Sequence, residues 1–218
     1  MSSRFFGTLL IIGALVGCYF VYQDYWAKEF KDRNPWTTRL APLIKPHLRH
    51  AGDVRDAGMA SDASFMMILQ MAWQAGEDGY SPQAAVRGAA IQAGAPIAEA
   101  DAIADAVNDN LLFAKKMEVF ADLKNPVNME RGESPIAVAK DWVDEPLVVG
   151  HRLPLSLAPE LAHALPNLRL VPRFARDMAT DQIGKDEMAL AKRWLQLKLL
   201  KPESMARLLE KVKEERSF

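Results

Sequence analysis

The sequence predicts a mainly α-helical protein in which an N-terminal membrane segment precedes a helical domain. Three observations lead to this fold class. An uncharged apolar run occupies residues 5–22, apolar residues recur with helical spacing over residues 61–123, and the same spacing returns within residues 174–218. The length of 218 residues allows one domain or two small ones. A single cysteine excludes an intramolecular disulfide and a zinc site built from several cysteines.

Residues 1–33 are expected to form a membrane anchor and a juxtamembrane helix. The run over residues 5–22 holds 18 residues without a charge. As a helix it would be about 27 Å long, close to the ~30 Å hydrocarbon core of a bilayer. Aromatic residues, which concentrate at the lipid–water boundary, lie near its downstream end: Tyr19, Tyr22, Tyr25 and Trp26. We expect one transmembrane helix, which Asn34-Pro35 ends because a residue before proline avoids the α conformation.

The same segment also allows a lipoprotein signal. Residues 15–18 read Leu-Val-Gly-Cys, as in a bacterial lipobox, and cleavage before Cys18 would leave a cysteine for lipidation. The residues after Cys18 are apolar rather than a polar tether, which favours the uncleaved helix. Either anchor would attach the chain to membrane lipid.

Two sequence features give opposite predictions for the side of the membrane on which the soluble domain lies. Basic residues after the apolar run outnumber those before it, and this favours a cytoplasmic domain. The signal-like N-terminus favours the outside. We expect the soluble domain outside the cytoplasm, on the periplasmic side of a Gram-negative cell.

Residues 34–60 are expected to connect the anchor to the folded domain. Histidine and aspartate recur in this segment at every third position: His47, His50, Asp53 and Asp56. On a helix the two histidines would share a face and could hold a metal ion. Gly52 would end that helix before the third ligand, so we expect a hydrated surface and predict neither a metal nor another cofactor.

Residues 61–123 are expected to fold as a unit of three helices. Ser61-Asp62 can cap the first helix, Ser81-Pro82 begins the second, and Pro96 begins the third. The third helix also carries a row of carboxylates at positions i, i+4 and i+8: Asp101, Asp105 and Asp109. A straight helix splays such side chains apart, so we interpret the row as a solvated acidic face rather than a cation site.

Residues 124–173 are expected to form an irregular apolar segment. Seven prolines in this stretch exclude long helices, yet its composition is too apolar for a disordered linker. The segment therefore either covers its own helices or lies on a partner protein. The residues predicted for partner contact are Trp142, Leu147, Val149, Leu153 and Leu155. Residues 147–149 could form a short strand, but no partner strand is evident.

Residues 174–218 are expected to form a helical hairpin. Apolar residues repeat at helical spacing before and after Pro202, which separates two amphipathic helices. Acidic residues are interleaved with the basic ones, and the net charge of the chain is −1. Both observations argue against binding to nucleic acid.

Catalytic motifs are absent from the sequence. It contains no GxSxG elbow, no GxxxxGK[ST] loop, no GxGxxG turn and no HExxH pair. A dispersed site near His151, with Asp144 and Glu145, is the remaining route to an enzyme. We regard the chain as more consistent with a non-enzyme.

These features predict a membrane-anchored accessory or scaffold subunit of a larger membrane complex, which acts by protein–protein binding. Its partners would be membrane lipid and other subunits of that complex. One alternative is an envelope lipoprotein that binds a periplasmic protein or ligand. A second alternative is an enzyme with its site near His151.

Overall fold

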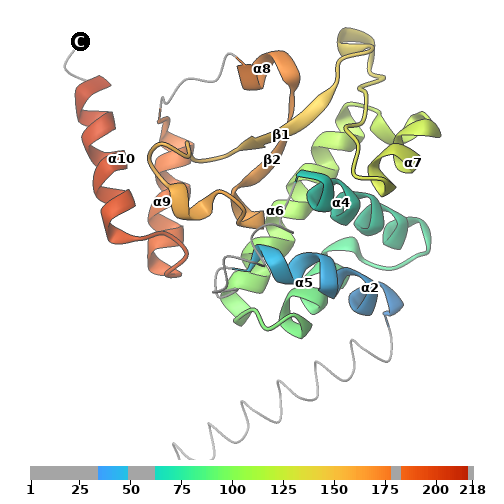
Figure 1. Ribbon diagram of the computed structural model, residues 1–218, viewed down its shortest axis with the longest axis horizontal. Helices are drawn as coiled ribbons and strands as arrows, with labels where there is room; N and C mark the ends of the chain where they lie inside the picture. Colours follow the sequence, from blue (N-terminus) through green and yellow to red (C-terminus); the bar gives the residue numbers. More distant parts are fainter. Residues whose placement is uncertain (1–33, 49–61, 178–182, 216–218) are drawn as a thin grey trace, which may run out of the picture.

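The computed structural model describes residues 34–48, 62–177 and 183–215. Within these ranges the chain is mainly helical, as the sequence predicts, with eight α-helices and one two-stranded antiparallel sheet. The sheet lies between the helices of the first half of the chain and a helical pair near the C-terminal end (Figure 1).

Helix α2 (Pro35–Ile44) begins where the sequence analysis expects a helix to end. The Asn34 side chain accepts a hydrogen bond from the Trp36 N–H at 3.1 Å, and proline occupies the first helical position. The apolar face of α2 packs on α5 (Pro82–Gln92). Residues 34–48 therefore belong to the folded domain, and their interpretation as part of a connecting segment is wrong. An Asn-Pro pair suits the start of a helix as well as a stop.

Helices α4 (Asp62–Glu77), α5 and α6 (Ile97–Lys116) lie within residues 61–123. Gly79 and Gly94 occupy the two connections with φ of 84° and 105°, a conformation that L side chains avoid. Alanines at the contact between α5 and α6 let the helix backbones approach closely. The buried alanines of these two helices include Ala85, Ala89, Ala90, Ala100 and Ala104.

The segment over residues 124–173 is more regular than expected. It contains α7 (Lys124–Glu130), and strand β1 (Leu147–His151) pairs with β2 (Leu168–Pro172) in antiparallel register. The statement that residues 147–149 have no partner strand is therefore wrong. Proline lies before or at the end of these strands instead of interrupting them. The connection between the strands, residues 152–167, is too long to be recognised from sequence as a hairpin turn. It holds the short 3₁₀ turns η4 (Pro159–Leu161) and η5 (Leu165–Asn167). The turns η2 (Val119–Ala121) and η3 (Lys140–Trp142) precede β1 in the chain, and α8 (Arg173–Asp177) follows β2.

Three buried asparagines bond to the backbone of this segment, and Asn110 attaches it to α6. Asn110 of α6 donates to the Leu168 carbonyl and accepts from the Leu170 N–H, so its amide occupies the edge of β2 that faces away from β1. Asn125 and Asn167 likewise bond only to backbone groups, each through both ends of the amide. Each amide satisfies backbone groups that could not reach water.

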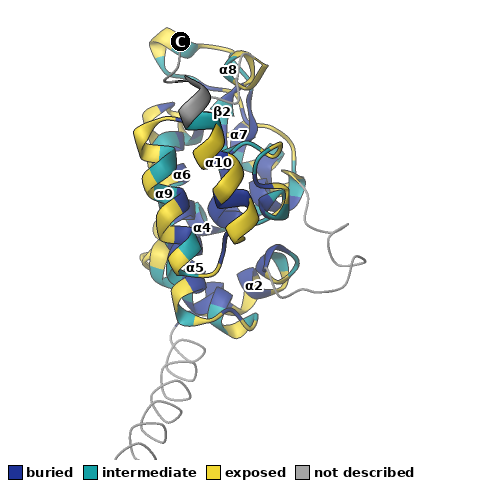
Figure 2. Ribbon diagram, turned by 90° about the vertical axis from the view of Figure 1, so that its left-hand side faces the viewer, coloured by how far each residue is buried: buried dark blue, intermediate teal, exposed yellow. Residues whose placement is uncertain are grey.

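The C-terminal pair, α9 (Lys185–Gln196) and α10 (Pro202–Glu215), forms a second apolar cluster with the loop between the strands and with Ala102 of α6. Glu160 of that loop accepts hydrogen bonds from the Lys201 N–H and the Ser204 hydroxyl at the start of α10. A carboxylate at a helix N-terminus is stabilised by the helix dipole. Figure 2 shows that α10 leaves its outer face exposed.

None of the described helices is long and apolar enough to cross a membrane. The predicted span over residues 5–22 lies outside the described residues, as does Cys18.

We predict that Asn110→Ala destabilises the domain by about 2–4 kcal/mol, because it removes three hydrogen bonds and leaves buried backbone groups of β2 unpaired. Urea denaturation measures the change. Asn108→Ala on the same helix is the control and should cost less than about 0.5 kcal/mol. Equal effects of the two substitutions would show that the amide does not hold the strand.

Candidate functional site

The structure buries three of the five residues that the sequence assigned to partner contact. Leu147 and Leu153 are fully buried, and Val149 is 4% exposed. Leu147 and Val149 face the main core from β1, and Leu153 packs in the second cluster. These three side chains cannot form a contact surface on the folded domain, because their apolar area is already removed from water by the chain itself.

The other two residues remain accessible but lie in different surroundings. Trp142 is half-buried; it packs on the main core and stacks on Phe174 with ring centroids 5.5 Å apart. Leu155 is 38% exposed in the loop after β1. Whether a partner binds either residue stays a prediction.

His151 does not meet the carboxylates that the sequence analysis grouped with it. Its Nε2–H donates to the Ala162 carbonyl at 3.1 Å, while Glu145 accepts from the Phe174 N–H. Burial lowers the pKa of His151, and the Ala162 carbonyl opposes that shift. The carboxylate whose charge raises its pKa is Asp62, and neither Asp144 nor Glu145 contributes, so the structure does not assemble the acid–base group that the sequence suggested.

His47 lies in the core rather than on a hydrated surface, so that expectation is wrong. It ends the 3₁₀ turn η1 (Lys45–His47) and is 2% exposed. Its Nδ1–H donates to the His163 carbonyl at 2.7 Å, which leaves Nε2 to accept from the Ser64 hydroxyl at 2.7 Å. The neutral ring thus joins the turn after α2, the start of α4 and the loop between the strands.

Burial lowers the pKa of His47 to about 4, against an opposing contribution from the His163 carbonyl. The neutral imidazole is therefore the form that the fold selects. Within the described residues, no three His, Cys, Asp or Glu side chains are placed to hold a metal ion. His50, Asp53 and Asp56 of the predicted spacing lie outside them.

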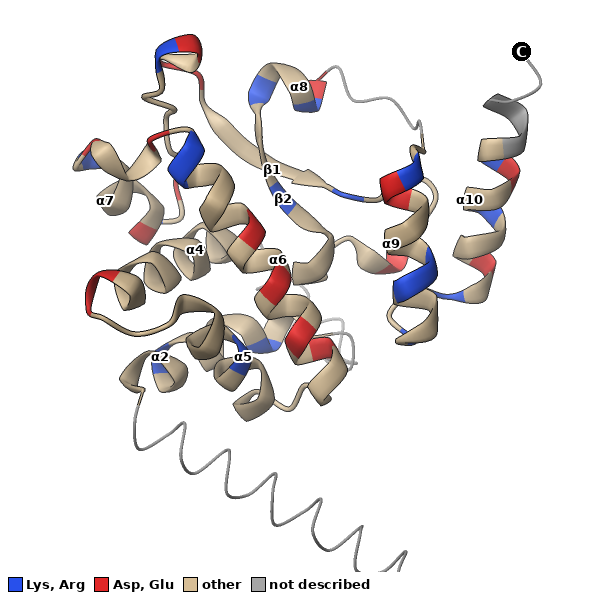
Figure 3. Ribbon diagram, turned by 180° about the vertical axis from the view of Figure 1, so that it is seen from behind, with Lys and Arg blue, Asp and Glu red and all other residues tan. Residues whose placement is uncertain are grey.

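The acidic row on α6 is paired as well as solvated. Asp101 meets Arg87 of α5 at 2.6 Å, and Asp105 meets Arg193 of α9 at 3.4 Å. Asp109 meets Arg152, the residue after β1, at 2.9 Å. In Figure 3 acidic positions, in red, follow the ribbon of α6. All three remain about half exposed, so each pair contributes no more than about 1 kcal/mol.

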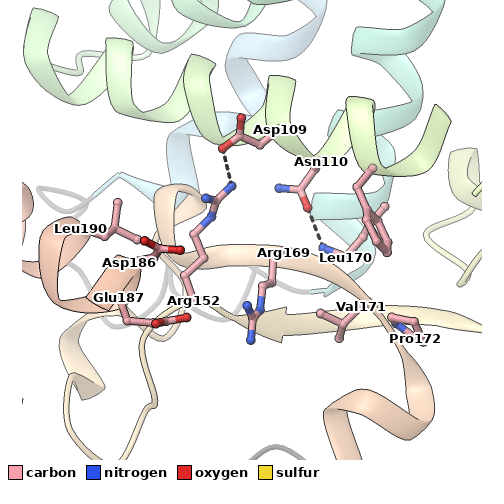
Figure 4. Close-up of a pocket in the computed structure, with 11 residues that line it drawn as sticks. Asp109, Asn110, Arg152, Arg169, Leu170, Val171, Pro172, Asp186, Glu187 and Leu190 are labelled. Atoms are coloured by element: carbon pink, nitrogen blue, oxygen red, sulfur yellow. Dashed lines mark hydrogen bonds and ion pairs between the residues drawn. The ribbon is translucent and has the colours of Figure 1, made fainter. Parts of the chain in front are cut away.

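A cleft of about 410 Å³ opens where α6, β2 and the start of α9 meet. We name it the Arg169 cleft. Its lining combines apolar and charged side chains, and Figure 4 shows Asp109 and Asn110 on α6, Arg152 and Arg169 from the sheet, and Asp186 and Glu187 on α9. The apolar part of the lining includes Phe113, Leu170, Val171, Pro172 and Leu190.

A second depression of about 510 Å³, the apolar groove, lies between α4 and α6 and is closed at one end by η2. Trp73 and Phe120 stack face to face in it, with ring centroids 4.5 Å apart and an interplanar angle of 2°. Leu112 on its α6 wall is 59% exposed. Charged side chains at the groove are Glu77, Lys115 and Glu118.

Neither depression was predicted from the sequence. Leu-Arg-Leu-Val-Pro at residues 168–172 alternates in burial, and this period-two pattern is the signal that could have marked β2 and placed Arg169 on its outer face. The groove has no comparable signal, since Trp73 and Phe120 are 47 positions apart in the sequence.

No protein-family model, curated protein or solved structure matches this chain. The features that bear on function are therefore the cleft, the groove and the predicted anchor.

We predict that His47 makes folding stability fall in mild acid. Its folded pKa of about 4 lies below the ordinary value of 6.5, so the unfolded chain binds the proton more readily. The contribution of His47 to the free energy of unfolding, about 3 kcal/mol in total, is present above pH ~6.5 and is lost as the pH falls towards ~4. Urea midpoints across this range measure it.

His47→Gln should flatten this part of the pH profile relative to the unmodified chain. The comparison variant is His163→Gln, which leaves in place the backbone carbonyl that accepts from His47. It should keep most of the pH dependence, because burial and not the His163 charge is the largest cause of the lowered pKa of His47. A pH profile unchanged by His47→Gln would contradict the assignment.

Proposed function

We propose that the chain is a membrane-anchored accessory or scaffold subunit of a larger membrane complex, with its soluble domain outside the cytoplasm. It acts by binding another subunit through the apolar groove. The apolar run over residues 5–22 supports the anchor. The exposed groove is the observation that carries the binding role.

The groove has the composition of a protein-binding site. Two stacked aromatic rings lie in it, and aromatic side chains supply much of the binding energy at protein interfaces. Leu112 lies largely in water on one wall, and Leu123, just beyond the groove in sequence, is 84% exposed. Exposed apolar side chains around a groove mark this surface as a candidate protein-interaction site.

The position of the groove fits a partner that lies near the membrane. The Trp36 indole N–H donates to Asp78 at 3.1 Å, and Glu77 and Gly76 of the same turn line the groove. One end of the groove thus lies beside the start of the folded domain, immediately after the predicted anchor. The groove occupies the space between two helices, which suits the apolar face of a helix from another subunit.

The lipoprotein alternative differs from this proposal in how the chain is anchored, so an intact-mass measurement distinguishes the two. The enzyme near His151 is not proposed, because that ring bonds to a backbone carbonyl and meets neither of the predicted carboxylates.

We predict that Leu112→Glu weakens assembly by at least about tenfold, because it places a charge in the apolar contact. The measurement is the amount of partner subunit that remains with the full chain after gentle solubilisation of native membranes. The melting temperature should stay nearly unchanged, since Leu112 is exposed.

Leu209→Glu on α10 is the matched control, a substitution of a leucine that is 43% exposed and distant in sequence from the groove. A photo-crosslinking residue at position 112, but not at 209, should attach to the same partner. Unchanged assembly with Leu112→Glu, or equal crosslinking from both positions, would contradict the groove as the binding surface.

We predict that an intact-mass measurement finds residues 1–17 retained, because the apolar run continues past Cys18. Cys18→Ser should then leave the protein in the membrane fraction. Loss of residues 1–17 with an acyl adduct on Cys18, and release of the domain by Cys18→Ser, would establish the lipoprotein instead.

A further inference from the structure

Two arginines project from the same face of the β1–β2 ribbon into the Arg169 cleft. Gly150 pairs with Arg169 across the strands, and the Arg152 N–H bonds to the Asn167 carbonyl two residue pairs further along. Side chains two residues apart on a strand share a face, so both arginines lie on the side of Gly150. That residue adds no side chain between them, and a Cβ there would lie 2.9 Å from Val171.

The two guanidinium groups differ in their partners. Arg152 pairs with Asp109 at 2.9 Å. Arg169 forms no ion pair with a described residue. The Nε atoms of both arginines are buried without a hydrogen-bond partner, so the ion pair is what distinguishes the two groups. A buried donor on a cation is costly unless a ligand or another group satisfies it. Arg169 is therefore the group in the cleft that most favours an added anion.

The facing wall has the opposite charge. Asp186 and Glu187 lie in the first turn of α9, and neither is ion-paired with Arg152 or Arg169 among the described residues. Two arginines stand against three carboxylates in the lining, so the cleft is net negative. That balance disfavours a simple anion and favours a ligand that carries both signs.

Apolar side chains lie in the same lining as these charges: Phe113 on α6, Val171 on β2 and Leu190 on α9. The volume of about 410 Å³ falls within the ~300–1,000 Å³ range of small-molecule sites.

We propose that the Arg169 cleft binds a small zwitterion of the amino-acid class with an apolar side chain. Its carboxylate pairs with Arg169, its ammonium group pairs with Asp186 and Glu187, and its side chain contacts Phe113 and Leu190. This site is separate from the apolar groove, so its test does not depend on whether the proposed partner subunit binds the groove.

Equilibrium dialysis of the full-length chain in mild detergent tests the proposal, with radiolabelled L-leucine and L-phenylalanine as probes at up to about 10 mM. At least one probe should bind. Two analogues of leucine test the contribution of each charged group of the ligand. Isocaproate lacks the ammonium group, and isoamylamine lacks the carboxylate. Each should bind at least about tenfold more weakly than L-leucine, or than L-phenylalanine if only that probe binds.

Single substitutions test whether the lining residues of the Arg169 cleft bind the amino acid. Arg169→Gln should weaken amino-acid binding at least about tenfold, whereas Arg87→Gln, which removes an ion-paired arginine of α5 outside the cleft, should not. Glu187→Gln should weaken amino-acid binding and strengthen isocaproate binding.

Absence of binding by both amino acids overturns the proposal. So does isocaproate or isoamylamine binding as tightly as the amino acid. If Arg169→Gln does not fold, this analogue comparison on the unmodified chain still decides between the outcomes.

Discussion

The fold depends on buried asparagine side chains that bond to the backbone of an extended, proline-rich segment. A short two-stranded ribbon cannot satisfy the outer edge of β2, and this edge lies against α6 rather than in water. Asn110 supplies the missing donor and acceptor at that edge. Asn125 likewise bonds to both peptide groups of Ile136, and Asn167 to both peptide groups of Leu153. Without these amides, burial of the segment would leave peptide groups unpaired.

This attachment determines which surfaces remain for binding. The apolar residues of β1 face inward because the ribbon is fixed on α6, so the segment covers the main core. The opposite face of the ribbon carries the arginines and forms the floor of the Arg169 cleft, with α9 as its second wall. The apolar groove lies elsewhere, between α4 and α6. The domain thus presents one charged depression and one apolar depression, and the two suit different classes of ligand.

Local chemistry made the helices predictable. Ser81-Pro82 and Pro96 mark helix starts, and residues 97–116 repeat apolar side chains at helical spacing, so α5 and α6 follow from capping and periodicity. The ribbon did not follow, because pairing of residues 147–151 with residues 168–172 joins distant stretches with no turn signal between them. His47 was misplaced for the same reason. Its partners, Ser64 and His163, are 17 and 116 positions away.

The sequence by itself determined the helical class, the starts of α5 and α6 and an apolar run long enough for a membrane span, since each depends on neighbours within a few turns of chain. Only the tertiary structure decided which apolar residues of the proline-rich segment are exposed and which charges meet. Leu147 and Leu155 look alike in sequence, yet one is fully buried and the other is exposed. Arg152 and Arg169 look alike too, but among the residues that the structure describes only Arg152 meets a carboxylate. Burial and charge pairing depend on long-range packing, which no local pattern encodes.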